Sequence, residues 1–113
     1  MSGIASLYNV PSTDEELTTW AFLHAAHHAD INRVIQQTQG VQLSAPVLNP
    51  FDPNDMQEWL DQHQILHQQM NQVLGISGFN LDEVDFNAEG QRAGWIWLNG
   101  QEHQQAGTKT GID

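Results

Sequence analysis

The 113-residue sequence contains no cysteine, and it has only three basic residues against fourteen acidic ones. Without cysteine the chain can form no disulfide framework, no thiolate metal site and no thiol nucleophile. Three Lys and Arg residues cannot neutralise a row of phosphates, which excludes sequence-independent binding to a nucleic-acid backbone. The formal charge of −11 at pH 7, with histidine counted as neutral, predicts a strongly acidic surface.

Long apolar runs are also missing. No segment approaches the roughly 20 apolar residues that a membrane-spanning helix needs, and residues 1–10 have neither the basic nor the apolar region of a secretory signal. We therefore expect no membrane partner and a protein that remains where it is made, although a virion component would also lack a signal. Hydrophobic residues make up 39% of the chain, below the usual ~45–50%, which predicts a modest core.

Three segments have the apolar spacing of amphipathic helices. Ser12 and Thr13 each precede a glutamate by three residues, as in a capping box, and Gly40 offers a stop for the helix that follows. Asp52 before a proline is a typical start for the second helix, and Gly75 is its stop. Three glycines weaken the third helix by about 1 kcal/mol each, so it depends on tertiary packing. The predicted helices are residues 13–38, 53–74 and 88–106.

The remaining segments complete the predicted architecture. Residues 41–53 hold three prolines within eight residues, which excludes a helix, and their apolar side chains favour an extended strap across the helices over a free linker. For residues 76–86 we predict a second compact connection with one helical turn. We expect residues 1–11 to form a flexible arm and residues 107–113 to form a frayed tail. The predicted fold class is all-α, with residues 12–106 forming a three-helix bundle with a Pro-rich strap.

An internal repeat is the most specific feature of the sequence. Each expected helix carries a tryptophan that is followed, at two steps of four residues, by two polar residues that are mostly histidine. This spacing keeps all three positions on one helical face. The repeat consists of Trp20, His24 and His28; Trp59, His63 and His67; and Trp95, Asn99 and His103. Five of the six histidines therefore belong to one structural pattern.

The same helical faces carry the apolar positions, so we expect the repeat to point into the core. Buried polar groups must be hydrogen-bonded. The sequence favours a network of imidazole, indole and amide groups that fixes the register of the helices. If the helices alternate in direction, His24, His63 and Asn99 meet in a central layer. In that arrangement Trp59 lies level with His28, and each outer layer mixes indole with imidazole.

Two sharper interpretations of the repeat stay open. Histidines at i and i+4 on one helix can chelate a metal ion, although no HExxH motif is present. The candidate ligands are His24, His28, His63, His67 and His103. A catalytic histidine is the other interpretation, but Asp30 and Asp61 lie off the shared face, and no nucleophile elbow, phosphate loop or dinucleotide motif occurs. The sequence therefore assigns no catalytic residue and no cofactor, and it predicts a protein without enzyme activity.

Two ring-bearing residues lie outside the repeat. His27 is next to His28 but off the pattern, so we expect it at the surface or on the flank of the core. Trp97 points about 160° away from Trp95 on an ideal helix. It therefore either packs under the strap or is exposed as an anchor for another subunit.

Several segments resemble small helical proteins of tailed bacteriophages that are encoded near virion structural genes. The similarity rests on the W-x3-H-x3-H-x2-[IM]-N pattern and on VLNPFDP (47–53), VLGISGFNLDEVDF (73–86) and WIWLNGQEHQQAG (95–107), and it spans most of residues 1–112. That family has no assigned catalytic residues, so none is carried over to this chain.

The resemblance implies a structural role in a virion. The expected protein is a head–tail connector (adaptor) or another tail- or capsid-associated component, made in the host cytoplasm and incorporated into the particle. Its expected partners are portal, tail or capsid proteins and further copies of the same chain. Its acidity suits a position near DNA without specific nucleic-acid binding. The alternative function is a small binding module with a metal site at the histidines.

Overall fold

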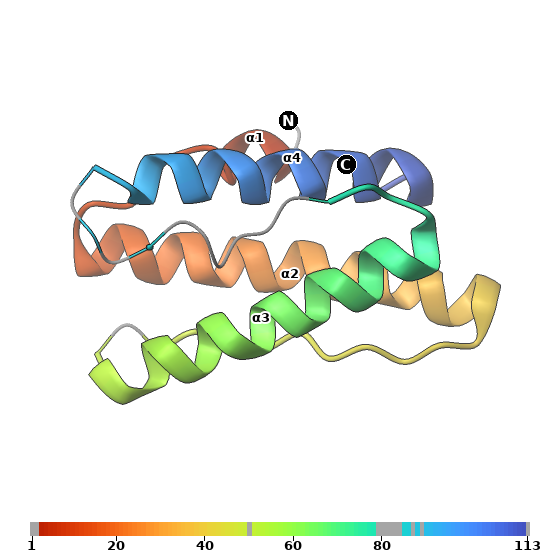
Figure 1. Ribbon diagram of the computed structural model, residues 1–113, viewed down its shortest axis with the longest axis horizontal. Coiled ribbons are helices and arrows are strands. Elements are labelled where there is room, and N and C mark those ends of the chain that lie inside the picture. Colours follow the sequence, from red (N-terminus) through yellow and green to blue (C-terminus); the bar gives the residue numbers. More distant parts are fainter. Residues whose placement is uncertain (1–2, 50, 79–84, 87, 89, 113) are drawn as a thin grey trace.

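The computed structural model describes residues 3–49, 51–78, 85, 86, 88 and 90–112. Within these residues the chain forms four helices and no strand, which confirms the predicted all-α class (Figure 1). The helices are α1 (Gly3–Ser6), α2 (Asp14–Gln39), α3 (Pro53–Leu74) and α4 (Arg92–Thr110). Most of the turn predicted within 76–86 lies outside the described residues. No helix in the described part is long and apolar enough to cross a bilayer.

The ends of α2 and α3 follow the capping chemistry of the sequence. The Thr13 side chain accepts a hydrogen bond from the Glu16 N–H at 3.1 Å, and the Glu16 carboxylate accepts one from the Ser12 N–H at 3.2 Å. Asp52 caps a first-turn N–H of α3 in the same way. Both helices end at the predicted glycine, whose φ is 70°. The bounds of α3 are those predicted, and α2 is displaced by one residue at each end.

Helix α4 begins and ends four residues later than the predicted 88–106. Its last turn is packed too closely for a side chain at Gly107, where an added Cβ would lie 2.4 Å from the Ile112 oxygen and 2.9 Å from Ile4. The Ile112 N–H donates a hydrogen bond to the Gly107 carbonyl at 3.0 Å, which closes the helix end. The predicted fraying of the tail is therefore wrong through Ile112.

The N-terminal arm is a packed part of the fold, which corrects the prediction that it is flexible. Leu7 is fully buried, and its carbonyl accepts a hydrogen bond from the Trp20 indole N–H at 3.1 Å. The Tyr8 ring lies against α4 at Gly100, where an added Cβ would come within 2.6 Å of it. These contacts hold α1 and the residues after it against α2 and α4 (Figure 1).

Replacing Gly100 with alanine tests the contact between the arm and α4. The new methyl group would overlap the Tyr8 ring, so we expect a loss of about 1–3 kcal/mol in the free energy of unfolding, despite the ~1 kcal/mol gain in helix propensity. Denaturant unfolding measures the change. Gly94→Ala is the matched control, because Gly94 is exposed on the same helix and should gain stability. Equal stabilisation of both variants would contradict the packed arm.

The three long helices run in the same direction, which corrects the alternating arrangement (Figure 1). Trp20, Trp59 and Trp95 pack against one another with ring centroids 5.8–5.9 Å apart, so all three lie at one level. Trp59 is therefore level with Trp20 and not with His28. Parallel helices need long return connections, and residues 41–52, at ~3.3 Å per extended residue, can span about 40 Å. That matches the length of α2, 26 residues at ~1.5 Å each.

The segment between α2 and α3 makes specific contacts along its return path. Leu48 is buried among the tryptophans of the core. The Trp59 indole N–H donates a hydrogen bond to the Pro46 carbonyl at 3.3 Å. The Asn32 amide donates one to the Ser44 carbonyl at 3.0 Å. These bonds satisfy backbone carbonyls that belong to no helix or strand.

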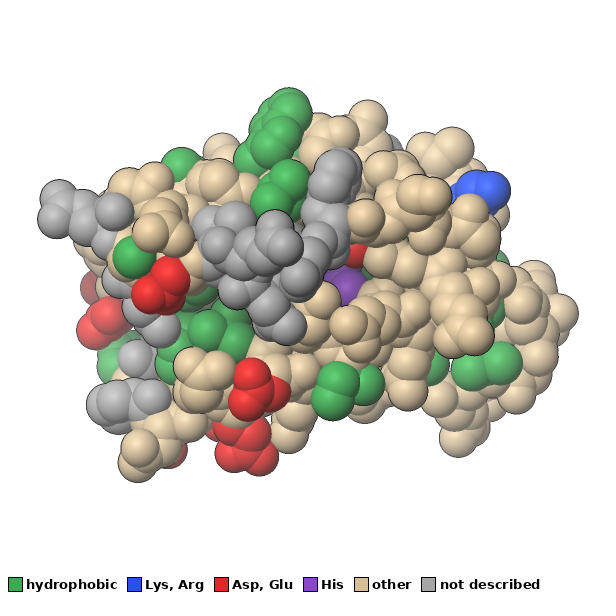
Figure 2. Space-filling model, in the orientation of Figure 1, with side chains coloured by type: hydrophobic (Ala, Val, Ile, Leu, Met, Phe, Trp, Pro, Cys, Tyr) green, Lys and Arg blue, Asp and Glu red, His purple; other side chains and the backbone are tan. Residues whose placement is uncertain are grey.

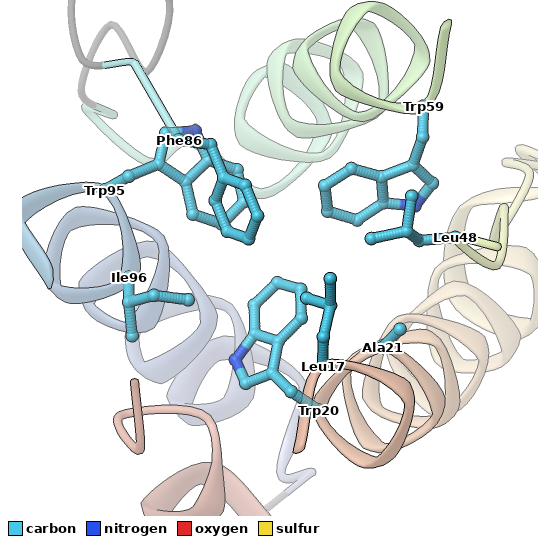
Figure 3. Close-up of a cluster of buried hydrophobic side chains, with 8 residues drawn as sticks. All are labelled: Leu17, Trp20, Ala21, Leu48, Trp59, Phe86, Trp95 and Ile96. Atoms are coloured by element: carbon cyan, nitrogen blue, oxygen red, sulfur yellow. The ribbon is translucent and has the colours of Figure 1, made fainter. Parts of the chain in front are cut away.

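Two apolar clusters fill the interior, one toward each end of the parallel helices. The first, in which indoles from three helices converge (Figure 3), contains Leu17, Trp20, Ala21, Leu48, Trp59, Phe86, Trp95 and Ile96. The second contains Ile31, Ile35, Met70 and Ala106. The polar positions of the repeat fall between these two sets in every long helix. The histidines therefore occupy the middle of the interior, closed off by apolar side chains at both ends.

Candidate metal centre

The five histidines of the repeat converge on one point between the helices. Each offers one ring nitrogen, and all five nitrogens lie within 4.8 Å of one another. The five rings are at most 1% exposed. They come from three helices: His24 and His28 from α2, His63 and His67 from α3, and His103 from α4. Every metal-ligand candidate that the sequence proposed is thus in the same cluster.

His24 is the most connected member of this cluster. Its Nε2 lies 3.0 Å from Nε2 of His63 and 2.9 Å from Nε2 of His103. Oδ1 of Asn99 lies 3.2 Å from the same nitrogen, so the predicted layer of His24, His63 and Asn99 is confirmed. A neutral imidazole nitrogen either donates one hydrogen bond or accepts through one lone pair. If Nε2 of His24 carries a proton and donates it to Asn99 Oδ1, it has no second proton for the nitrogens of His63 and His103. If Nε2 instead accepts a hydrogen bond from one of these nitrogens, its lone pair faces the Asn99 oxygen, which is also an acceptor.

The outer ring nitrogens of three histidines lack hydrogen-bond partners in the described part of the chain. His28 and His67 share a single contact, 3.0 Å between their Nε2 atoms, which one proton can satisfy. The Nδ1 atoms of His24, His28 and His67 have no hydrogen-bond partner among the described residues. A buried polar group that is left unsatisfied costs about 1–3 kcal/mol. An ion bound at Nε2 would leave the same Nδ1 atoms without a partner, so the choice between a network and a metal site depends on the Nε2 atoms.

A single metal ion accounts for the Nε2 separations. Imidazole nitrogens bind ions such as Zn²⁺ at about 2.0–2.1 Å, which places adjacent ligands of one ion roughly 2.8–3.4 Å apart, from octahedral to tetrahedral geometry. The Nε2 separations of 2.9–3.0 Å lie in the octahedral part of that range. The largest separation, 4.8 Å, exceeds the ~4.2 Å limit for two ligands of one ion. The rings would therefore have to move inward by a few tenths of an ångström for all five to bind one ion.

The protonation state of the rings suits metal binding. Burial lowers the pKa of His24, His28, His63 and His103 well below 6.5, and the neighbouring histidines lower each pKa further. These rings are therefore neutral at pH 7. A neutral imidazole has the free lone pair that a metal ion needs, so no proton has to be displaced from them on binding.

The tryptophans of the repeat fix the orientation of the histidines. The Trp20 indole stacks on the His24 ring, with centroids 4.6 Å apart and planes inclined by 14°. Trp59 stacks on His63 in the same way, at 4.8 Å and 21°. The four-residue step brings each pair together on its own helix. The tryptophan of the repeat is thus a support for the imidazole one turn later.

Glu102 is a fully buried carboxylate behind the cluster. Its Oε1 lies 3.5 Å from Nδ1 of His67 and accepts a hydrogen bond from the Asn71 amide at 2.5 Å. Metal-binding histidines commonly direct their second ring nitrogen to a carboxylate, which fixes the ring and raises its basicity. Glu102 is placed to do this for His67, whose Nε2 faces the other histidines.

Changing Glu102 to glutamine tests this supporting role. The substitution keeps the size of the side chain and removes its charge, so we expect metal affinity to fall about 10–100-fold. Competition with a chromophoric chelator measures the affinity. Glu58→Gln, at an exposed position on α3, is the control and should bind metal as the wild type does. Unchanged affinity in Glu102→Gln would exclude the carboxylate from the site.

His27 is buried, which corrects the prediction of a surface or flanking position. Its Nδ1 lies 2.7 Å from Nδ1 of His103, so this contact leaves Nε2 of His103 directed at His24. The sequence spacing could have indicated that His27 is buried, because His27 follows His24 by three residues and precedes Ile31 by four, so it lies near their face of the helix. His27 therefore orients a member of the cluster.

The second residue left open by the sequence, Trp97, is exposed. More than half of its surface is accessible, and its ring leans on Tyr8 at a centroid distance of 5.5 Å. It does not pack under residues 41–49. Of the two alternatives, the structure supports exposure on the outer face of α4.

Among the described residues, Glu102 is the one buried Asp, Glu, Lys or Arg side chain, and the others lie nearer the surface. Figure 2 shows acidic side chains gathered toward the end of the molecule where α2 and α3 begin, and a basic side chain at the opposite end. The first turns hold Asp14, Glu15, Glu16 and Asp55, and the last turn of α4 holds Lys109. Because the helices are parallel, their dipoles add, and these charges stabilise both ends.

No family model matches this chain, and comparison with curated proteins and with solved structures found no significant match.

Proposed function

We propose that this chain is a metal-binding helical module. In this proposal a parallel three-helix bundle, tied by the Pro-rich strap 41–53, holds one divalent transition-metal ion. The ligands are His24, His28, His63, His67 and His103. The observation that carries the proposal is the convergence of their five buried ring nitrogens within 4.8 Å. Three polar atoms compete for the single proton or lone pair of His24 Nε2, whereas an ion would bind the lone pairs of all five nitrogens at once.

The donor set indicates the class of ion. Imidazole suits Zn²⁺, Cu²⁺, Ni²⁺ and Fe²⁺, whereas Mg²⁺ and Ca²⁺ prefer oxygen ligands. Imidazole ligands do not offset the charge of a dication. The carboxyl group of Glu102, 3.5 Å from the His67 ring, is the acidic side chain in contact with the cluster. The ion proposed for this site is therefore a first-row transition metal.

The proposed role of the ion is structural. Its ligands come from three helices that are far apart in the sequence, so binding would fasten these helices to one another. Metal binding free energy then adds to folding free energy, as in other small metal-containing domains. The cluster is enclosed between two apolar groups of side chains. These features support a protein without enzyme activity.

Titration of the chelator-stripped chain with Ni²⁺, Co²⁺ and Zn²⁺ in a calorimeter tests the proposal. We expect one ion per chain. The double variant His63→Ala/His67→Ala should lose this binding, because it removes two adjacent ligands. The control Gln62→Ala/Gln68→Ala changes exposed positions on the same helix and should bind as the wild type does. Absence of binding to the wild type, or equal binding by the double variant, would overturn the proposal.

We propose as a second function that the module is a structural component of a tailed-phage particle. A head–tail connector or another tail- or capsid-associated position is compatible with the metal site. The supporting observation is the exposure of three large apolar side chains, Phe22, Phe51 and Trp97, each 57–70% accessible. Such side chains are typical of surfaces that contact other proteins. Other copies of this chain and further virion proteins are the proposed partners.

Native mass measurement and proteomics of purified virions test this second proposal. We expect a ring or another closed oligomer in solution, and the protein in particles that have been washed free of host material. A monomer that is absent from such particles would contradict it. This outcome would leave the metal site unaffected, because all its ligands come from one chain.

A further inference from the structure

The parallel helices give the centre a threefold pattern that five histidines do not complete. Each long helix contributes one i, i+4 pair, so three helices provide six inward positions. Because the helices run in the same direction, these positions form two layers of three. The first layer is His24, His63 and Asn99, and the second is His28, His67 and His103. Two stacked triangles of ligands are opposite faces of an octahedron when they are staggered, and in these two layers only Asn99 is not histidine.

Asn99 has the position and the geometry of a sixth ligand. The residue is fully buried, and its Oδ1 lies 3.2 Å from Nε2 of His24. Adjacent ligands of a six-coordinate ion at ~2.0–2.1 Å lie about 2.8–3.0 Å apart, so Oδ1 would have to move by only ~0.2–0.4 Å to fit. Its Nδ2 has no hydrogen-bond partner among the described residues, whereas its amide contacts the rings of both His24 and His63.

Glu102 is the other buried oxygen donor near the cluster, but it lies on the wrong side of a ring. Its carboxylate contacts Nδ1 of His67, while Nε2 of the same ring faces His28. The ring therefore separates the carboxylate from the point where the other nitrogens meet. Glu102 can support His67 but does not complete the ligand set.

We propose, resting on the proposed metal-binding function, that Oδ1 of Asn99 is the sixth ligand of a six-coordinate ion. The coordination sphere is then five imidazole nitrogens and one amide oxygen, with no exchangeable water. Such a sphere fits Ni²⁺, Co²⁺ or Fe²⁺ better than Zn²⁺, which takes four ligands in structural sites. It also excludes Lewis-acid catalysis at the ion, which requires an open position.

Absorption spectra of the Co²⁺-loaded chain test the sixth ligand. Six-coordinate Co²⁺ gives weak visible bands, and we expect addition of azide to leave them unchanged in the wild type. In Asn99→Ala the amide oxygen is lost, so azide should enter and change the spectrum, and Co²⁺ affinity should fall about 10–100-fold. Asn99→Asp keeps an oxygen donor and should restore resistance to azide.

Asn32→Ala is the matched control, because Asn32 is also a buried amide on a long helix but bonds the Ser44 carbonyl. It should lose stability without a change in the Co²⁺ spectrum. An azide-induced change in the wild type, or wild-type affinity and azide resistance in Asn99→Ala, would overturn the sixth ligand while metal binding stands. If the wild type binds no Co²⁺, Ni²⁺ or Zn²⁺, both proposals fail. If Asn99→Ala does not fold, the intensity of the wild-type Co²⁺ bands decides the matter, because a five-coordinate ion would absorb more strongly than the six-coordinate ion proposed.

Discussion

Lowering the pH from 7.5 to 5.5 is expected to reduce the free energy of unfolding of the metal-free chain by about 5 kcal/mol. The cause is the set of buried histidines. In the unfolded chain each histidine titrates near 6.5, whereas burial lowers the folded pKa of His24, His28, His63 and His103 well below that value. Below pH 6.5 the unfolded chain therefore binds protons that the folded chain does not.

The sign and the size of this effect follow from proton linkage. Stability rises with pH wherever the unfolded state binds more protons, so acidification destabilises the fold. A histidine that stays neutral when folded loses about 1.4 kcal/mol between pH 7.5 and 5.5, and four such residues give the total of about 5 kcal/mol. Above pH ~7.5 both states are neutral at these residues, and their contribution is constant. Small domains have only ~5–15 kcal/mol in total.

Urea unfolding at several pH values, with a chelator present throughout, measures the slope. Aspartate and glutamate titrate near 3.9 and 4.3 in unfolded chains, roughly a unit or more below the lower pH limit, so histidine dominates the slope. We expect the slope to approach four protons near pH 5.5. A total loss of less than ~1.4 kcal/mol would mean that no more than one ring is buried in its neutral form.

Saturation with Ni²⁺ or Co²⁺ is expected to raise the melting temperature on the order of 15 °C. At a free metal concentration a thousand times Kd, binding to the folded state adds about 4 kcal/mol. A domain of this length gains roughly 4 °C per kcal/mol. The gain is expected because folding brings the ligands together from α2, α3 and α4, which the unfolded chain holds apart.

Thermal scans with metal, with chelator and with Mg²⁺ separate this effect from a general effect of salt. Mg²⁺ prefers oxygen ligands and does not suit an imidazole site, so it should leave the melting temperature unchanged. The same scans on His63→Ala/His67→Ala should show no difference between metal and chelator. Equal melting temperatures of the wild type in metal and in chelator would support a cluster held by hydrogen bonds alone.

The convergence of the histidines could be predicted from the sequence because it depends on spacing alone. Steps of four residues place Trp20, His24 and His28 on one face of α2, and the same holds for α3. Burial of these positions then follows from the apolar residues that share the face. The bounds of α3 were equally predictable, since Asp52 and Gly75 act locally at its two ends.

The relative direction of the helices could not be predicted from spacing, because the residues on a buried face do not specify whether the neighbouring helix runs parallel or antiparallel. The alternating arrangement assumed that connections return by the shortest route. The structure instead uses the non-helical residues 41–49 to bring the chain back toward the start of α2, where α3 begins (Figure 1). Parallel helices place the tryptophan and both polar positions of all three repeats level at the same time, whereas alternating helices would align the middle positions alone.

The choice between a hydrogen-bonded network and a metal site also required distances. Both interpretations need buried histidines, and the sequence favoured the network. The contacts of His24 with His63, His103 and Asn99 show that one nitrogen faces three polar atoms at 2.9–3.2 Å. Counting protons at that nitrogen is what favours an ion, and no sequence pattern gives that count.

The central claim is that one metal ion lies between the five histidine rings, and anomalous diffraction tests it most directly. Crystals of the chain grown with Ni²⁺ or Co²⁺ would be measured on both sides of the absorption edge of that metal. The proposal predicts one strong anomalous peak per chain, about 2.1 Å from a ring nitrogen of each of the five histidines. A well-ordered histidine cluster without such a peak, or a peak bound only at surface residues, would contradict it.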